Sequence, residues 1–212
     1  MTGIYVFSED PRLAAELVTT AAALADEVYV VCLGADAART LAATGATSVV
    51  VLEAAGPGTV GAPRPEAYVA ALAGLVRDRG ADLLIVGATV SGWEIAARVA
   101  VLLDSALVSE ASVITALPDG AWQAERVMYA GGAVQTETWS GTAVVTVAAG
   151  RAVAAAAPGS TSPVEVVAVD VDARVRVVSR TTRVRAGVDL ASAARVVCVG
   201  MGLGEPGDLA LA

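Results

Sequence analysis

The sequence predicts an α/β protein with a mostly parallel sheet and an antiparallel extension. Hydrophobic residues make up 56% of its 212 residues and charged residues only 17%, so the chain can bury a sizeable core. The apolar residues are mostly Ala and Val in short runs between turn residues, which is typical of a buried parallel sheet. Strand-like runs alternate with helical patterns four times before residue 105, which predicts right-handed crossovers.

The first half of the chain supplies the expected parallel unit. The expected strands occupy residues 3–7, 27–33, 48–52 and 82–87, and a fifth extended segment occupies 106–117. The expected helices occupy residues 11–24, 35–45, 65–80 and 91–103. Apolar positions three and four residues apart predict the buried helix faces. These positions are Leu13, Leu17, Ala21 and Leu24, then Tyr68, Leu72, Leu75 and Val76, and finally Ile95, Val99, Leu102 and Leu103.

The pattern changes after the turn Pro118-Asp119-Gly120. Residues 121–150 hold strand-like runs broken by glycines and no helical period, so we expect the antiparallel extension there. Residues 151–163 are rich in small residues and form the expected linker. Further strand-like segments follow at 164–171, 174–185 and 194–200.

Composition excludes several function classes. The net charge is −8, all 14 basic residues are arginine, and the chain has no lysine and no histidine. A nucleic-acid partner needs a basic stripe, a Ser-His-Asp triad needs histidine, and a P-loop needs lysine. A hydrolase is also disfavoured, since no nucleophile has an adjacent base. These absences exclude much of ordinary enzyme chemistry, and we expect no catalytic residues and no metal site.

Location and cysteine chemistry follow from the same composition. The first 12 residues lack the pattern of a signal peptide, and Gly150 and Arg151 interrupt the most apolar window. We therefore expect a cytoplasmic protein without membrane insertion. Cys32 and Cys198 lie in strand-like runs far apart in the sequence, so both are expected to be small buried hydrophobic residues.

The loop at residues 86–94 is the first candidate site. It connects an expected central strand to a helix, where open α/β sheets bind ligands and helix amides hold phosphate. The other interpretation is that Ser91 and Glu94 form a capping box, with Gly87 and Gly92 allowing a tight turn. We favour the cap because the loop has no basic residue. A free-standing module that binds AMP or ATP there stays open as the alternative function.

Three other patterns have simple structural interpretations. Asp170 and Asp172 are expected on a solvated strand face, because a metal site would need a third ligand nearby. The Arg174–Arg176 and Arg183–Arg185 pairs are expected to meet acidic groups. Tyr129, Gly131 and Gly132 suggest a bulge.

A further pattern, G-L-G-E-P-G at 202–207, has the letters of a dinucleotide fingerprint, but no strand-helix-strand unit follows it.

The order of several segments resembles the alpha subunit of electron-transfer flavoproteins. They are "LLIVGATVSGWEIAARVAVLLDSALVSEA" at 83–111, "ERVMYAGGAVQTE" at 125–137, "STSPVEV" at 160–166 and "RVVCVGMGLGEPGD" at 195–208. The resemblance covers essentially the whole chain but only the family's first domain. It implies a Rossmann-like three-layer domain at 1–195, and a segment at 196–212 that leads into a flavin-binding domain.

The resemblance also implies cofactors and partners. Family members take electrons from flavin dehydrogenases and pass them through FAD to an acceptor such as a quinone reductase. FAD is held by a separate C-terminal domain, and the beta subunit holds AMP. By position, Gly200, Met201 and Gly202 are the FAD-contacting residues in the full-length complex. Met201 stands where the family has an arginine.

We therefore expect an electron carrier component, not a catalyst. This domain would dock the beta subunit as a heterodimer, and the 212-residue chain alone would bind little or no FAD. Besides Met201, two other residues depart from the family pattern: Val199 replaces a glycine and Gly132 replaces an asparagine. We expect the intact protein to continue past residue 212 into a flavin domain, with a natural relative that consists of the first domain alone as the alternative.

Overall fold

The computed structural model describes two units of the chain, Met1–Val177 and Val178–Ala212. The residues that it describes are 3–55, 64–154, 161–175, 177–179, 181, 190, 193–200, 202 and 207. All the helices and strands named below lie in the first unit.

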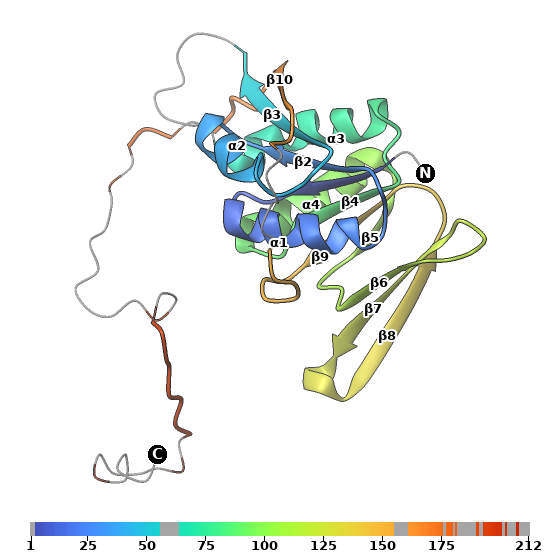
Figure 1. Cartoon of the computed structure of the whole chain (residues 1–212), viewed down its shortest axis with the longest axis vertical. Coiled ribbons are helices and arrows are strands. Elements are labelled where there is room, and N and C mark those ends of the chain that lie inside the picture. Colours follow the sequence, from blue (N-terminus) through green and yellow to red (C-terminus); the bar gives the residue numbers. More distant parts are fainter. Residues whose placement is uncertain are drawn as a thin grey trace. The chain divides into compact units, whose positions relative to one another are not determined.

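Seven parallel strands form the central sheet, in the order β10-β3-β2-β1-β4-β9-β5 (Figure 1). Their bounds are β1 (Ile4–Phe7), β2 (Val28–Cys32), β3 (Ser48–Ala54), β4 (Leu83–Gly87), β5 (Ala106–Val108), β9 (Ala143–Val147) and β10 (Val164–Val169). The central strands β1, β4 and β9 are buried at every position, as their unbroken apolar sequences require.

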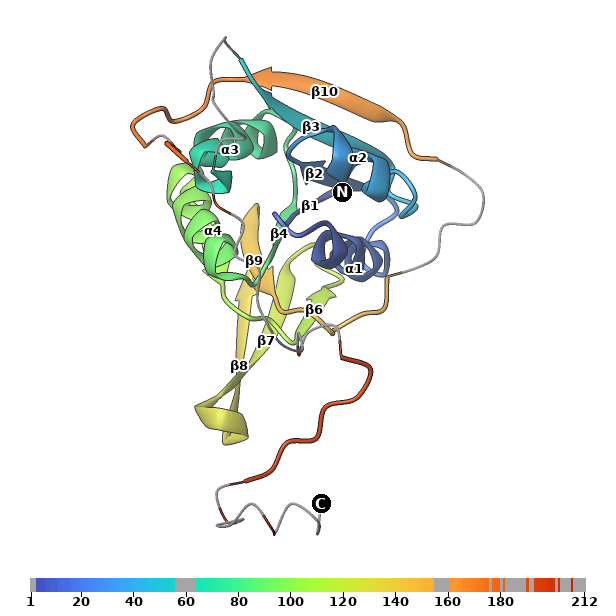
Figure 2. The ribbon, with the colours of Figure 1, turned by 90° about the vertical axis from the view of Figure 1, so that its left-hand side faces the viewer.

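Helices cover both faces of this sheet, which confirms the predicted α/β class with three layers (Figure 2). The helices are α1 (Pro11–Ala22), α2 (Ala35–Leu41), α3 (Val69–Asp78) and α4 (Val90–Leu103), and the 3-10 turn η1 (Pro65–Tyr68) precedes α3. One core cluster joins α1 and α2 to the sheet, and a second joins η1, α3 and α4 to its other face.

The predicted helix faces are confirmed except at the ends of α1 and α4. Leu24 follows the end of α1 at Ala22 and is only half-buried. Asp10 caps α1 by accepting the Arg12 N–H at 2.9 Å. In the third predicted helix, Tyr68 at the end of η1 and the three predicted positions of α3 are buried. Ile95 and Val99 of α4 are buried, but Leu102 is 46% exposed, so its prediction was wrong. Leu102 lies at the edge of the buried face, which runs along Ile95, Ala96, Val99 and Ala100.

A small antiparallel sheet packs on the face of the central sheet that α1 covers, and it contains the predicted antiparallel strands. Its strands are β6 (Val113–Ala116), β7 (Trp122–Met128) and β8 (Ala133–Trp139), in the order β6-β7-β8. Trp122 and Ala124 join the first core cluster. The expectation that 143–147 continues the antiparallel part was wrong, because β9 pairs in parallel with both β4 and β5. Its sequence, AVVTV, suits a strand that is buried on both faces.

The second unit differs from the sequence-based expectation. Residues 194–200 were predicted to be a strand, but within the described part of the chain they pair with no strand, and Val196, Val197 and Val199 are 57, 74 and 40% exposed. Unpaired backbone does not hold a strand, whatever the β-propensity of its residues. Cys198 is exposed there, so its predicted burial was also wrong, whereas Cys32 is buried as expected. Much of 174–185 lies outside the described residues.

Candidate functional site

The strand order places a topological switch point between β1 and β4. The chain lays down β1, β2 and β3 in one direction and then returns to the other side of β1 with β4. Open α/β sheets bind ligands outside the carboxyl ends of the strands at such a point. Here those ends lead into Ser8–Asp10 and Ala88–Val90, so the predicted loop at 86–94 lies at the switch point.

A hydrogen bond between Thr89 and Glu9 joins the two loops at this switch point. The Thr89 hydroxyl accepts the Gly92 N–H at 2.9 Å and donates to Oε1 of Glu9. The other oxygen of Glu9, Oε2, is buried and has no hydrogen-bond partner in the part of the chain that is described. Thr89 therefore caps α4, and a carboxylate stands beside the helix N-terminus where a phosphate would need to bind. The geometry disfavours the AMP or ATP alternative at this loop.

The two glycines of the loop allow close packing, Gly92 against backbone and Gly87 against the side chains of Leu13 and Ser8. A Cβ on Gly92 would lie 1.8 Å from the carbonyl oxygen of Gly87, and a Cβ on Gly87 would lie 2.7 Å from Ser8 Oγ. The first turn of α4 therefore packs directly on the end of β4. The predicted tight turn is confirmed. It needs a glycine at 92 because the backbone there lies against the backbone of Gly87.

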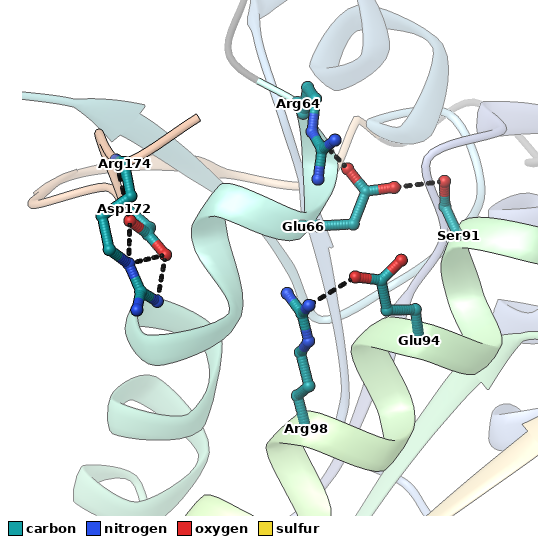
Figure 3. A network of polar contacts seen from close by, with 7 residues as sticks. All are labelled: Arg64, Glu66, Ser91, Glu94, Arg98, Asp172 and Arg174. Atoms are coloured by element: carbon teal, nitrogen blue, oxygen red, sulfur yellow. Dashed lines mark hydrogen bonds and ion pairs between the residues drawn. The ribbon is translucent and has the colours of Figure 1, made fainter. Parts of the chain in front are cut away.

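The predicted capping box was wrong. Thr89, not Ser91, provides the cap, because the helix begins one residue earlier than the pattern suggested. The Ser91 hydroxyl instead donates to Glu66 Oε1 at 2.6 Å, and Glu94 pairs with Arg98 at 2.7 Å (Figure 3). Ser91 thus links α4 to η1, a contact between elements that are far apart in sequence.

Charges near this link are balanced. Glu66 Oε2 lies 3.4 Å from Arg64 Nε, and Figure 3 shows Glu66 between Arg64 and Ser91. Burial alone would raise the pKa of Glu66, but the Ser91 hydrogen bond and the Arg64 and Arg98 charges lower it overall. A cavity of about 330 Å³ lies between these groups and Asp172. Each arginine here has a carboxylate partner, so none is left to hold a phosphate.

The acidic pair predicted on a strand face lies just beyond it. β10 ends at Val169, and Asp172 binds Arg174 through two side-chain nitrogens at 2.6 and 2.9 Å. This hydrogen bonding lowers the pKa of the Asp172 carboxyl to about 2. The described residues contain no group of three potential metal ligands. Arg174 meets an acidic group as predicted, and Arg176, Arg183 and Arg185 lie outside the described residues.

The glycines near Tyr129 form a hairpin tip. Tyr129 and Ala130 have φ of 50° and 52°, and the turn connects β7 to β8. The predicted bulge was therefore wrong, because the two strands pair up to Met128 and Ala133 without an extra residue. Tyr129 is 83% exposed.

The sequence did not predict the apolar hollow between α2 and the β3–β10 edge. It encloses about 830 Å³, and Ala38, Val51, Tyr68, Val164 and Val166 are among its lining residues. Val164 and Val166, two alternate residues of β10, face it, and this alternation is a signal that the sequence offered.

Two of the three predicted flavin-contacting residues, Gly200 and Gly202, are among the described residues of the second unit. Gly200 and Gly202 are exposed, and no atom lies within 4 Å of the position that a Cβ would take at either residue. Met201 lies outside the described residues. The contact of these residues with FAD stays a prediction.

Comparison with known proteins identifies the family. Residues 11–173 match the family described as "Electron transfer flavoprotein domain". The chain is 34% identical to "Putative electron transfer flavoprotein subunit YdiR" of Escherichia coli (strain K12), over 99% of this chain and 66% of that protein. It is 31% identical, with the same coverage, to "Protein FixB" of Escherichia coli (strain SMS-3-5 / SECEC) and of Shigella dysenteriae serotype 1 (strain Sd197).

The chain belongs to the electron transfer flavoprotein family. It spans 66% of the length of these relatives. Members of the family are electron carriers, and their full complexes bind FAD. Within the described residues, no helix is long and apolar enough to cross a bilayer.

Proposed function

We propose that this chain is the N-terminal domain of an electron-transfer flavoprotein alpha subunit. Residues 1–195 would form that domain, and 196–212 would lead into a flavin-binding domain. The observation that carries the proposal is the match of 99% of the chain to alpha-like relatives of which it spans only 66%. The cytoplasmic location predicted from the sequence belongs to the same proposal.

The role of this domain is to bind the partner, and the redox chemistry belongs to FAD. FAD supplies the electron transfer from flavin dehydrogenases to a quinone-reductase-type acceptor when it is bound. This domain docks the beta subunit, which holds AMP, and positions the flavin domain. Gly200, Met201 and Gly202 would contact FAD only within the full-length complex. A methionine at 201 has no charge with which to stabilise a reduced, anionic flavin.

Two features of the switch point support a binding role for the domain. The α4 N-terminus is capped by Thr89 and flanked by the Glu9 carboxylate, so it offers no phosphate site. Protein groups therefore occupy the switch point at the ends of β1 and β4.

Co-expression with the electron-transfer flavoprotein beta subunit of the same organism tests the proposal. We expect a tagged 212-residue chain to retain the beta subunit through affinity purification and gel filtration. The chain expressed alone should elute without visible flavin absorbance. Stoichiometric flavin on the chain alone, or a beta subunit that washes off completely, would overturn the proposal.

A further inference from the structure

Helix α2 is held firmly at its C-terminal end. Leu41 there is fully buried in the first core cluster, and the Ala42 carbonyl accepts the Ser162 N–H at 2.8 Å. The Thr44 hydroxyl donates to the Leu41 carbonyl at 2.7 Å and so closes the last turn. These contacts fix this end of α2 to the core and to the residues that lead into β10.

The N-terminal turn of α2 is held much less. Ala35 and Asp36 are exposed, and Ala37 is only half-buried against the first core cluster. Asp36 and Arg39 pair with each other, and their side chains are 93 and 74% exposed. Gly34 precedes the helix and has no side chain that could cap it, whereas α1 and α4 have side-chain caps. A helix of seven residues gains little stability of its own.

Gly34 is suited to be a hinge between β2 and α2. Its φ of 87° and ψ of 158° lie in a region that favours glycine, and no atom lies within 4 Å of the position that a Cβ would take. A hinge residue absorbs a change in φ and ψ, and at this position neither a side chain nor a neighbour resists that change. The first turn of α2 is therefore free to move while β2 stays in the sheet.

This turn borders the apolar hollow of about 830 Å³ between α2 and the edge of the sheet. Ala35, Ala38 and Ala42 line the hollow from α2, three and four residues apart on one side of the helix. Val164 and Val166 line it from β10 and are 49 and 59% exposed. One wall therefore has small side chains, and the other wall has valines that are left half in water.

We propose that α2 is a hinged lid over this hollow. Its first turn swings at Gly34 toward β10 and covers Val164 and Val166, while its C-terminal end stays in place. Burial of the two valines favours the closed position. The Arg39 side chain lines the open hollow and must leave it, which its 74% exposure allows. The inference goes beyond the proposed function, because this motion needs neither a flavin nor a partner subunit.

Methyl relaxation dispersion, measured by NMR on the 212-residue chain, tests whether α2 moves, because lid motions fall in the μs–s range. We expect dispersion at the methyl groups of Ala35, Val164 and Val166. The matched control is Val134 of β8, which is 60% exposed but belongs to the antiparallel sheet and should give a flat profile. Flat profiles at Ala35 and at both β10 valines would overturn the lid.

Ala35→Leu tests the direction of the motion. A leucine at this exposed position extends the apolar side of α2 into the hollow and should shift the population at least ~10-fold toward the closed position. Nuclear Overhauser contacts between the new leucine methyls and the Val166 methyls should then appear. Ala35→Gln is the matched control, because glutamine has nearly the helix propensity of leucine but is polar. It should keep the wild-type profile.

Val166→Ser removes the apolar target on β10. The double variant Ala35→Leu/Val166→Ser should lose the ~10-fold shift, while circular dichroism shows that it is folded. A shift that persists in the double variant, or one that Ala35→Gln also produces, would contradict closure onto β10. An Ala35→Leu variant with the wild-type profile would overturn closure as well.

Discussion

Replacing Gly92 by alanine tests the packing of α4 on β4. The new Cβ would lie 1.8 Å from the Gly87 carbonyl oxygen, so the helix start must move by at least about 1.2 Å to restore 3.0 Å. Overpacking costs about 1–3 kcal/mol, and loss of the Thr89 cap costs about 1 kcal/mol. The gain in helix propensity offsets ~1 kcal/mol. We therefore expect the free energy of unfolding to fall by about 1–3 kcal/mol.

Gly74→Ala is the matched control. Gly74 lies inside α3, and no atom lies within 4 Å of its would-be Cβ. This variant should gain about 0.5–1 kcal/mol, because alanine restricts the unfolded chain and favours the helix. Urea unfolding followed by circular dichroism measures both. The packing argument is refuted if Gly92→Ala is as stable as the wild type while Gly74→Ala is stabilised.

Two further predictions follow from the thiols and from Glu66. In the native protein Cys198 should react quickly with a thiol reagent at neutral pH, because it is exposed. Cys32 should react slowly, because burial raises the pKa of its thiol to about 11. Equal reaction rates of the two thiols would contradict this prediction. The lowered pKa of Glu66 means that its contribution to stability is present above the unfolded pKa and is lost as the pH falls through the folded pKa. Glu66→Gln should therefore flatten the acid side of the stability–pH curve, and an unchanged slope would count against the Ser91 and Arg64 contacts.

Local patterns predicted the helices and their buried faces well. Leu72 and Val76 are buried as their spacing required, and Asp10 with Pro11 starts α1. Such features depend on residues a few positions apart, and the sequence contains that information. The position of β9 could not be obtained in this way. Its run AVVTV suits any strand buried on both faces, and only its neighbours β4 and β5 decide its direction.

The candidate site was located correctly but its contacts were not predicted. The loop at 86–94 follows a central strand, as predicted, and the observed strand order makes the end of that strand part of the switch point. Thr89 became the cap in place of Ser91, since Glu9 from the β1 end and Glu66 from η1 provide partners that are distant in sequence. The same reasoning explains the failure at Cys198, where β-propensity could not supply a neighbouring strand.

The central claim is that this chain binds the electron-transfer flavoprotein beta subunit and holds no flavin alone. Light scattering during gel filtration of an equimolar mixture of the two proteins tests it most directly, with absorbance recorded along the profile. We predict one peak with the mass of a 1:1 complex and no flavin absorbance from the chain when it runs alone. Two separate peaks with the masses of the free proteins, or a flavin-bearing chain on its own, would contradict the account.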